Sequence, residues 1–331
     1  MKNTNAVVCM GELLIDFFCT DIEVDLIEGS HFLKQAGGAP ANVSAAIAKL
    51  GGQAVFAGKV GDDPFGHFLK KTLQDVKVDT SMLTLDPNSR TTLAFVSLKA
   101  DGERDFTFHR GADGLLTWKD LNIPQILQSK IIHFGSATAM LEGPSQETYF
   151  QVMECAKENN LFISFDPNYR EFLWKGKTEG FRELAKKALA FADFLKVSEE
   201  ELQLIAGTEK LEDGVKMLHQ FGAKWISVTL GKEGSFVSNA EQAAMVKSIQ
   251  VKSMDSTGAG DAFVGANLFQ LSRLAHPQTI LHDFEKIKDI TSFSNTVAAL
   301  VCTQIGAISA LPSYETVMKR YKPQNINEVQ A

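Results

Sequence analysis

Short apolar runs alternate with amphipathic helical patterns along most of the 331-residue chain, and this alternation constrains the fold more than any other feature. Runs such as 130–136 and 223–231 have the length and residue content of buried strands, and patterns such as 143–160 and 211–222 have helical spacing. Repeated strand–helix units predict a mainly parallel sheet with helices on both faces. We therefore expect a three-layer α/β fold.

Two segments depart from this alternation. Residues 11–20 with 30–38, and residues 90–112, have the pattern of antiparallel strands, and the second segment has a hairpin signal around Ala100–Glu103. Because these strands are too few for an independent domain, we expect a small β-sheet lid on the α/β body. The predicted parts are an α/β domain of residues 1–12, 36–90 and 113–320, a β lid of residues 13–35 and 91–112, and a polar tail of residues 321–331.

Charge and composition exclude several classes of protein. The formal net charge is −7 and no run of Lys and Arg is longer than two, so we expect no nucleic-acid partner. No stretch approaches the ~20 apolar residues of a membrane span. Four cysteines without CxxC spacing, and a first segment without the pattern of an export signal, predict a cytoplasmic protein. Seven scattered histidines predict no dedicated transition-metal site.

The strongest local signal is the segment from Asp255 to Asp261. Its small residues Gly258–Gly260 precede an apolar helical pattern, and N–H groups at such a helix start can bind a phosphate group. Asp261 would then face the transferring group. The alternative is a glycine-rich loop with Asp261 as an ordinary first-turn residue.

A second glycine-rich segment, Gly37–Ser44, also opens a helical pattern. Paired glycines allow the backbone to come close to a ligand, and Asn42 offers both a donor and an acceptor, which suits a polyol. The alternative is a tight turn in which Asn42 belongs to the helix start.

Together, in this order and about 215 residues apart, the two motifs resemble the signatures of the ribokinase-like (PfkB) family of carbohydrate kinases. The resemblance extends from Gly11 to about Pro312, and within the family it is nearest to fructokinases. It implies a ribokinase-like fold and ATP-dependent phosphorylation of a sugar at a primary hydroxyl, with D-fructose converted to fructose 6-phosphate. It also implies that Asp261 is the catalytic base and that Gly258, Ala259 and Gly260 form the anion hole.

The resemblance also implies the sugar contacts. The implied contacts outside the lid hairpin are Asp16, Gly37, Gly38, Asn42, Glu142 and Arg170. From the lid, Phe106, Phe108 and Arg110 would close over the sugar and exclude water. The alternatives are a solvated loop for Glu142, a surface salt bridge for Arg170, and packing within the lid or between lids for the two phenylalanines. His109 is assigned a structural role.

At the nucleotide end, the resemblance implies a set of ATP contacts and a loop, residues 301–312, around the adenine. The implied ATP contacts are Lys196, Thr229, Gly231, Gly234, Thr257, Gly258, Gly260 and Asn295. Glu201 is the candidate for Mg²⁺, through water, although Ser198 stands where many members carry an asparagine; a solvated helix start is the alternative for both. Asp255 is the candidate for a monovalent cation such as K⁺, which the residues themselves do not decide.

Other functions stay open at this point. The same chemistry on 2-keto-3-deoxygluconate or ribose is the first alternative, and a non-catalytic sugar-binding regulator is the second. A dehydrogenase is disfavoured because the first predicted strand is not followed by a G-x-G-x-x-G turn. Exposed apolar lid edges also predict a homodimer through the lid.

Overall fold

A nine-stranded sheet forms the centre of the computed structural model, which describes residues 6–100 and 104–321. Across the sheet the strands are β13 (Ala243–Val246), β12 (Ser235–Ser238), β11 (Trp225–Thr229), β10 (Phe194–Ser198), β9 (Phe162–Asp166), β8 (Ile131–Gly135), β1 (Val7–Met10), β4 (Ala54–Gly61) and β5 (Asp79–Asp86). Neighbouring strands are parallel from β5 to β11, whereas β12 and β13 each pair antiparallel. The predicted mainly parallel sheet is confirmed.

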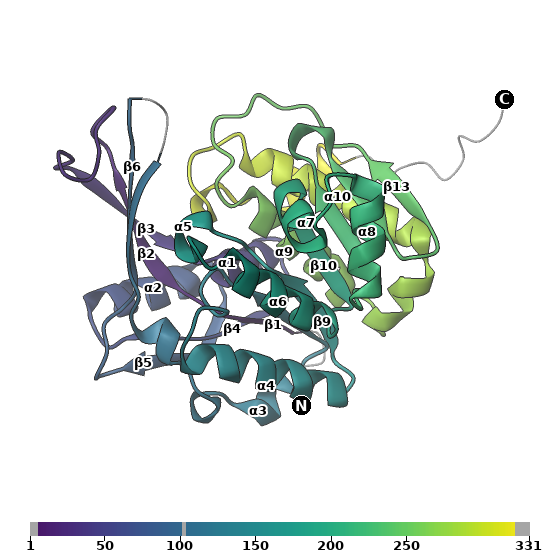
Figure 1. Ribbon diagram of the computed structural model, residues 1–331, viewed down its shortest axis with the longest axis horizontal. Coiled ribbons are helices and arrows are strands. Elements are labelled where there is room, and N and C mark those ends of the chain that lie inside the picture. Colours follow the sequence, from purple (N-terminus) through teal and green to yellow (C-terminus); the bar gives the residue numbers. More distant parts are fainter. Residues whose placement is uncertain (1–5, 101–103, 322–331) are drawn as a thin grey trace.

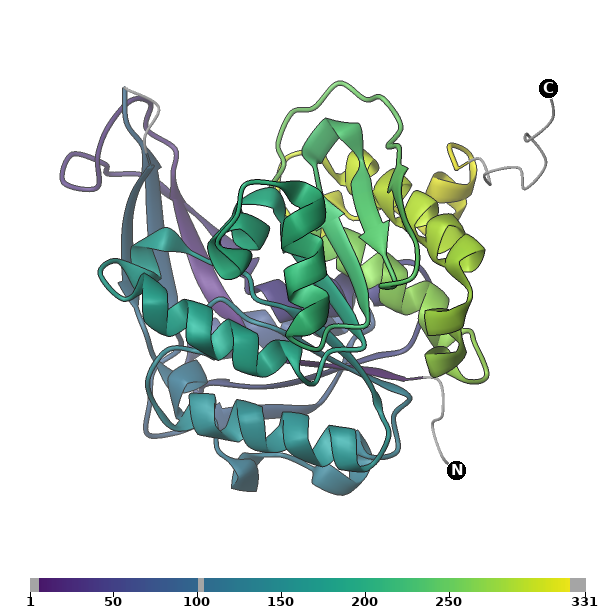
Figure 2. The ribbon, with the colours of Figure 1, turned by 45° about the vertical axis from the view of Figure 1, so that its right-hand side comes forward.

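Helices cover both faces of this sheet, as Figures 1 and 2 show. One face carries α3 (Ile123–Ile126), α4 (Pro144–Glu158), α6 (Thr178–Leu189), α7 (Glu199–Ala206) and α8 (Leu211–Gln220). The other face carries α1 (Ala39–Lys49), α2 (Pro64–Asp75), α9 (Ala259–Ser272), α10 (Phe284–Val301) and α11 (Tyr314–Met318). Short 3₁₀ turns span Ala112–Leu115, Trp118–Asp120, Gly231–Glu233, Pro277–His282 and Ile308–Ala310.

The alternation of side chains along each strand explains why the sheet is apolar on both faces. In β1, Val8 and Met10 belong to the core beneath α4, while Val7 and Cys9 belong to the core beneath α1 and α9. Successive side chains of a strand point to opposite faces, so a strand covered on both sides must be apolar at every position. The predicted α/β fold with three layers is confirmed.

A separate four-stranded sheet stands out from one side of the body (Figures 1 and 2). Its order is β3 (Phe32–Gly37), β2 (Leu14–Cys19), β6 (Leu93–Leu98) and β7 (Arg104–His109). The predicted hairpin is present as the antiparallel pair β6–β7, although part of its turn, 101–103, lies outside the described residues. Strands β2 and β3 are antiparallel as expected, but β2 pairs parallel with β6. We call these four strands the lid sheet.

Several elements were not individually predicted from the sequence. They include β5, β13 and α10, whose patterns are mixed or lie next to stronger ones.

Tyr321, the first residue of the predicted polar tail, packs against Phe293 and donates a hydrogen bond to Asp289. The rest of that tail lies outside the described residues, and the domain boundaries themselves stay a prediction. Among the described helices, none is both long and apolar enough to cross a bilayer.

Candidate active site

The site lies at the carboxyl edge of the central sheet, where the direction of the strand order reverses. Strand β1 is flanked by β4 on one side and β8 on the other, so later strands extend away from it in both directions. Such a switch point leaves a crevice at the strand ends. The chain enters the lid sheet directly after β1 and returns from β3 into α1. The two glycine-rich segments of the sequence meet at this edge.

Gly37 and Gly38 allow the backbone to approach the base of the lid closely. Gly38 has a φ of 111°, and a Cβ there would lie 2.4 Å from the carbonyl oxygen of Glu12. A Cβ on Gly37 would lie 1.9 Å from Oδ2 of Asp16. Because only glycine has both the conformational freedom and the space, these residues let Asp16 reach the loop that begins α1.

Asn42, in the first turns of α1, contacts Asp261, in the first turn of α9. Its Nδ2 donates to Oδ2 of Asp261 at 2.8 Å, and both side chains are buried. The Oδ1 atom of Asn42 has no hydrogen-bond partner among the described residues. A buried amide oxygen without a donor is costly unless a ligand supplies one. The structure therefore brings together the two residues that the two motifs singled out.

Burial changes the electrostatics of both carboxyl groups at this end of the crevice. It raises the pKa of Asp261 to about 6, against the opposing hydrogen bond from Asn42. It also raises the pKa of Asp16 to about 6, and the guanidinium of Arg170 opposes that shift. Arg170 acts on Asp261 in the same direction, while its Nη1 donates to the carbonyl of Tyr169 at 2.9 Å. The exposed Arg170 is thus within electrostatic reach of both carboxylates.

Gly258 forms the turn that starts α9. Its φ is 75°, in the left-handed region, and a Cβ there would lie 2.7 Å from Cβ of Ala307. The N–H of Ala262 donates to the carbonyl of Gly258, which closes the first helical turn. The first N–H groups of a helix lack intrahelical acceptors, so those after Gly258 form an anion-binding end.

Asp255 links this turn to the loop after α10. Its Oδ1 accepts hydrogen bonds from N and Oγ1 of Thr257, at 2.9 and 2.6 Å, and its Oδ2 accepts one from N of Gly306 at 2.9 Å. The carboxylate thus holds two loops together next to Gly258. Binding of a monovalent cation at Asp255, and of nucleotide at Thr257, stay predictions.

Lys196 lies buried in the middle of β10, between two acidic residues. Its Nζ is 3.1 Å from Oδ2 of Asp166 and 3.8 Å from Oε2 of Glu201. Burial alone would lower the pKa of Lys196, but the two carboxylates outweigh it and raise that pKa. A Cβ on Gly260 would lie 3.4 Å from this ammonium group, so the cation sits beside the anion-binding turn.

Glu201 is buried, and each of its carboxylate oxygens accepts one backbone hydrogen bond. It accepts hydrogen bonds from N of Tyr169 and N of Ser198, both at 2.7 Å, and Oγ of Ser198 accepts one from N of Glu201. This reciprocal capping box begins α7. Within the described residues, no group of three or more His, Cys, Asp or Glu is placed to hold a metal ion. A water-mediated contact of Glu201 with Mg²⁺ stays a prediction.

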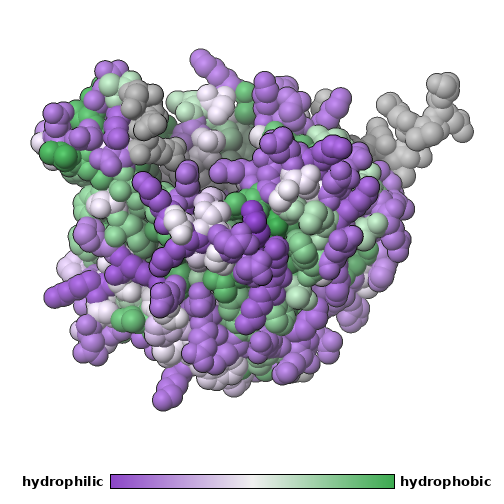
Figure 3. Space-filling model, in the orientation of Figure 1, coloured by the Kyte–Doolittle hydropathy of each residue, from purple (hydrophilic) through white to green (hydrophobic). Residues whose placement is uncertain are grey.

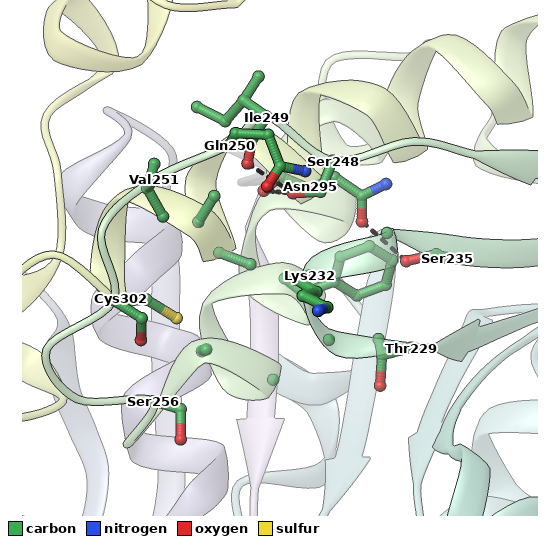
Figure 4. Close-up of a pocket in the computed structure, with 18 residues that line it drawn as sticks. Thr229, Lys232, Ser235, Ser248, Ile249, Gln250, Val251, Ser256, Asn295 and Cys302 are labelled. Carbon is green, nitrogen blue, oxygen red and sulfur yellow. Dashed lines mark hydrogen bonds between the residues drawn. The ribbon is translucent and has the colours of Figure 1, made fainter.

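A cavity of about 300 Å³ lies on the other side of the anion-binding turn (Figure 4). Five residues of the predicted nucleotide site line it: Thr229, Gly231, Gly234, Gly260 and Asn295. Figure 4 shows Asn295 at one end of the cavity, where it accepts a hydrogen bond from Ser235. Cys302 and Ser256 lie at the other end. Ala259 of the predicted anion hole and Cys302 of the predicted adenine loop line it as well. The sequence did not single out residues 248–251, Ser253, Ala298 and Ala299, which also line it.

The lid sheet turns one aromatic face toward the body. Phe106 and Phe108 alternate on β7, and the strand register places Asp16 and Ala94 on that same face. The ring of Phe106 lies 3.6 Å, centroid to centroid, from that of Phe172 in the body, within α5 (Glu171–Trp174). Packing against Phe172 was not anticipated. Contact of the two phenylalanines with sugar stays a prediction.

Arg110 and Glu142 lie at the base of the lid. The guanidinium of Arg110 donates to the carbonyl oxygens of Glu142 and Thr138, at 2.7 and 2.9 Å, and to Oγ of Ser145 at 2.8 Å. The side chain of Glu142 is exposed. The structure thus gives Arg110 contacts that fasten the lid to the body, and sugar binding by either residue stays a prediction.

Two buried carboxylates near the site were missed. Glu12 lies two residues after the last residue of β1, and Asp166 is the last residue of β9. Asp166 contacts Lys196 of the predicted nucleotide site, and Glu12 contacts Ala39 in the glycine-rich segment Gly37–Ser44. The sequence did contain a signal for them, since both acidic residues follow or end an apolar strand of the α/β pattern. Parallel strands end at the same edge of a sheet, so such residues are expected near the site.

Comparisons with known proteins agree with this geometry. Residues 4–314 match the pfkB family of carbohydrate kinases. The chain is 42% identical over 316 residues to fructokinase-1 of Oryza sativa subsp. japonica, which covers 95% of this chain and 96% of that protein. It is similar to the ATP-bound crystal structure of fructokinase from Xylella fastidiosa, with a TM-score of 0.87, 32% identity, and coverage of 96% and 98%.

A second solved structure has the same fold. It is a double mutant of the fructokinase from Vibrio cholerae O395 with fructose, ADP and potassium bound, with a TM-score of 0.84, 35% identity, and coverage of 96% and 98%. The similarity to these proteins extends over nearly the whole chain, and the motifs that suggested the family lie together in the crevice. The resemblance inferred from the sequence is therefore confirmed, and this chain belongs to the pfkB family of carbohydrate kinases.

Proposed function

We propose that this protein is a fructokinase, which transfers the γ-phosphoryl group of ATP to the 6-hydroxyl of D-fructose. The observation that carries the proposal is the position of Asp261: a buried carboxyl group with a pKa near 6, bonded to Asn42 and located in the first turn of α9. The names of the relatives, and the fructose, ATP and ADP bound in the solved neighbours, support the same substrates.

Asp261 suits the role of general base. A base is most effective when its pKa lies near the working pH, and burial brings this carboxyl group closer to that range. Asn42 donates a hydrogen bond to Oδ2 of Asp261, so Oδ1 of Asp261 is the oxygen available to a sugar hydroxyl. Removal of the hydroxyl proton by Asp261 would accompany in-line attack on the γ-phosphorus, with ADP as the leaving group.

Residues around Asp261 would bind and orient the reactants. Asp16 and Asn42 Oδ1 would accept hydrogen bonds from sugar hydroxyls, and Arg170 would offset negative charge near the transferring group. The N–H groups after Gly258 would stabilise the charge that develops on the phosphoryl oxygens. The lid face with Phe106 would exclude water, which otherwise competes as the acceptor.

The residues beside the anion-binding turn fit a magnesium–nucleotide complex. Carboxylate oxygens are the ligands that Mg²⁺ prefers, and Asp166 and Glu201 supply them next to the buried cation of Lys196. When bound, Mg²⁺ neutralises charge on the phosphates. We propose that these carboxylates hold the ion through water. A potassium-dependent activity through Asp255 is a further proposal, supported by the potassium ion in a solved neighbour.

We also propose that the protein forms a homodimer through the lid. Its cytoplasmic location and the domain boundaries given above are further parts of the proposal. Hydrophobic residues are exposed among hydrophilic ones at the tip of the lid sheet, at the upper left of Figure 3. Ile22 and Ile27 are 84% and 90% exposed, and Leu98 is 56% exposed. Ile22 and Ile27 lie between β2 and β3, and Leu98 is the last residue of β6. Exposed apolar groups of this kind favour association with a second copy. Light scattering on the purified protein should give the mass of a dimer, and Ile22→Lys with Ile27→Lys should give a monomer.

The substrate proposal is tested by coupled measurement of ADP release with ATP and magnesium across a panel of free sugars. The panel contains fructose, glucose, mannose, ribose and 2-keto-3-deoxygluconate, each with and without potassium. Turnover on fructose above all others, with the product identified as the 6-phosphate by NMR, is the expected result. Turnover on ribose or 2-keto-3-deoxygluconate instead would contradict fructose as the substrate, but it would still support a sugar kinase. Sugar binding without turnover would favour a regulator.

A further inference from the structure

Glu12 is a buried carboxylate that the proposed mechanism does not use. It follows β1, and its side chain is 2% exposed. Its Oε1 accepts hydrogen bonds from N of Ala39 at 3.0 Å and from N of Ala137 at 3.4 Å, and its Oε2 accepts one from Oγ of Ser136. Ala39 is the residue after Gly38 and begins α1. Glu12 therefore holds the sugar loop, residues 37–42, from beneath.

The same hydrogen bonds continue to the base of the lid. Oγ1 of Thr138, two residues after Ser136, donates to Oδ2 of Asp113 at 2.7 Å. Oγ1 of Thr92 donates to the other oxygen of Asp113 and accepts a hydrogen bond from N of Gly111 at 2.8 Å. Thr92 precedes β6 and Gly111 follows β7. Both ends of the lid hairpin are thus tied to the segment that Glu12 holds.

Both carboxylate oxygens of Glu12 act as acceptors in this network. Oγ of Ser136 accepts hydrogen bonds from N of Thr138 at 3.2 Å and N of Ala139 at 2.7 Å, so both of its lone pairs are occupied. Its single proton must go to an acceptor, which is Oε2 of Glu12. A glutamine at position 12 has one oxygen, so it could accept a hydrogen bond from only one of the two donors. Its NH₂ group would face the other donor, which is either the Ser136 hydroxyl or the N–H of Ala39. In both orientations a donor meets a donor.

We propose that Glu12 is a positioning residue for sugar binding, which fixes the loop 37–42 relative to the base of the lid. This inference rests on the proposed function. Glu12 does not touch the substrate; it acts through Ala39 and Ser136. The nucleotide cavity contains none of the residues of this network. The role of Glu12 is therefore confined to the sugar side of the reaction.

Steady-state kinetics of Glu12→Gln test this role. Loss of one charged hydrogen bond predicts a rise of about tenfold or more in KM for fructose, with KM for ATP changed by less than about twofold. The matched control is Asp193→Asn, a buried carboxylate that accepts a hydrogen bond from N of Ile163 at the opposite edge of the sheet. It should change neither KM. An unchanged KM for fructose, or equal rises for both substrates, would overturn the inference.

A second measurement does not depend on activity. Amide hydrogen exchange of peptides that cover residues 36–44 should be faster in Glu12→Gln than in the wild type, and unchanged in Asp193→Asn. Equal exchange in all three proteins would contradict the role of Glu12 even if the wild type proved inactive on every sugar, an outcome that would refute only the proposed function. If Glu12→Gln does not fold, Ser136→Ala removes the same link, and the same split in KM is expected from it.

Discussion

The two ends of the crevice differ in how completely the protein satisfies its own polar groups. At the sugar end, Asp16 and Asp261 have pKa values raised to about 6 by burial, and Oδ1 of Asn42 has no partner in the described part of the chain. At the nucleotide end, Lys196 is paired with two carboxylates, and Asn295 both accepts from Ser235 and donates to the carbonyl of Val246.

This difference indicates a division of labour. Polar groups left without partners in a buried site lower the stability of the free protein. They also disfavour binding of any ligand that cannot pair with them, so they confer selectivity for a hydroxyl-rich substrate. A cavity whose polar groups are already paired, as Asn295 is, offers a preformed surface to a nucleotide. We infer that selectivity lies mainly at the sugar end, and that the nucleotide end supplies binding and position.

The largest expected effect comes from removal of the base at the sugar end. Asp261→Asn keeps the size of the side chain and a partner for Asn42, but it cannot take a proton from a hydroxyl. Turnover should fall by about 10²–10⁴-fold or more, the range of general base catalysis. Calorimetric titration should show that fructose still binds. Near-normal turnover of this variant would remove Asp261 from the mechanism.

The next effect concerns stability at the nucleotide end. Lys196→Met would leave the buried carboxylates of Asp166 and Glu201 without their cation, and breaking such a pair costs about 3–5 kcal/mol. The matched control is Lys71→Met, which breaks the exposed pair with Asp75 and should cost less than about 1 kcal/mol. Urea unfolding measures both free energies. Similar losses in the two variants would show that burial does not distinguish these pairs.

A smaller effect is expected from filling the nucleotide cavity. Ala298 lines this cavity on α10, and Ala298→Leu adds a branched side chain to a space of about 300 Å³. Overpacking of this kind costs about 1–3 kcal/mol, so KM for ATP should rise by about tenfold. KM for fructose should stay within about twofold. A rise in KM for fructose as large as that for ATP would show that the two ends are not independent.

The sequence predicted those parts of the site that depend on local backbone geometry. Gly258 and Gly38 mark turns with positive φ, and each turn starts a helix whose first residues reach the crevice. Asn42 and Asp261 follow these turns at fixed offsets, so their positions could be inferred from the motifs once the family was suspected. Their mutual hydrogen bond could not, because it depends on how α1 and α9 pack.

Other residues depend on tertiary contacts that no short motif encodes. Glu12 and Asp166 acquire their partners from the order of strands across the sheet, which places the ends of β1, β8 and β9 side by side. The contact between Phe106 and Phe172 depends on the angle at which the lid stands over the body. The cavity wall formed by residues 248–251 has no regular structure and no distinctive spacing, so its role emerged only from the fold.

The raised pKa values predict opposite pH trends for stability and activity. An unfolded aspartate releases its proton near pH 4, whereas folded Asp16 and Asp261 retain theirs until about pH 6. Burial of Glu12 raises its pKa to about 7, with the same sign. The free energy of unfolding contributed by these groups is therefore fully present below pH 4 and is lost as the pH rises to about 7. Activity should increase over the upper part of this range.

The pH profile of kcat/KM for fructose tests the division between the two ends most directly. With ATP saturating, this ratio reports the ionisation of groups in the enzyme before sugar binds. We predict that it rises between pH 5 and about pH 7 and is flat from there to pH 8, because Asp261 must be ionised to accept the proton. A profile that is flat from pH 5 to pH 8 would contradict a buried, raised carboxyl group as the base.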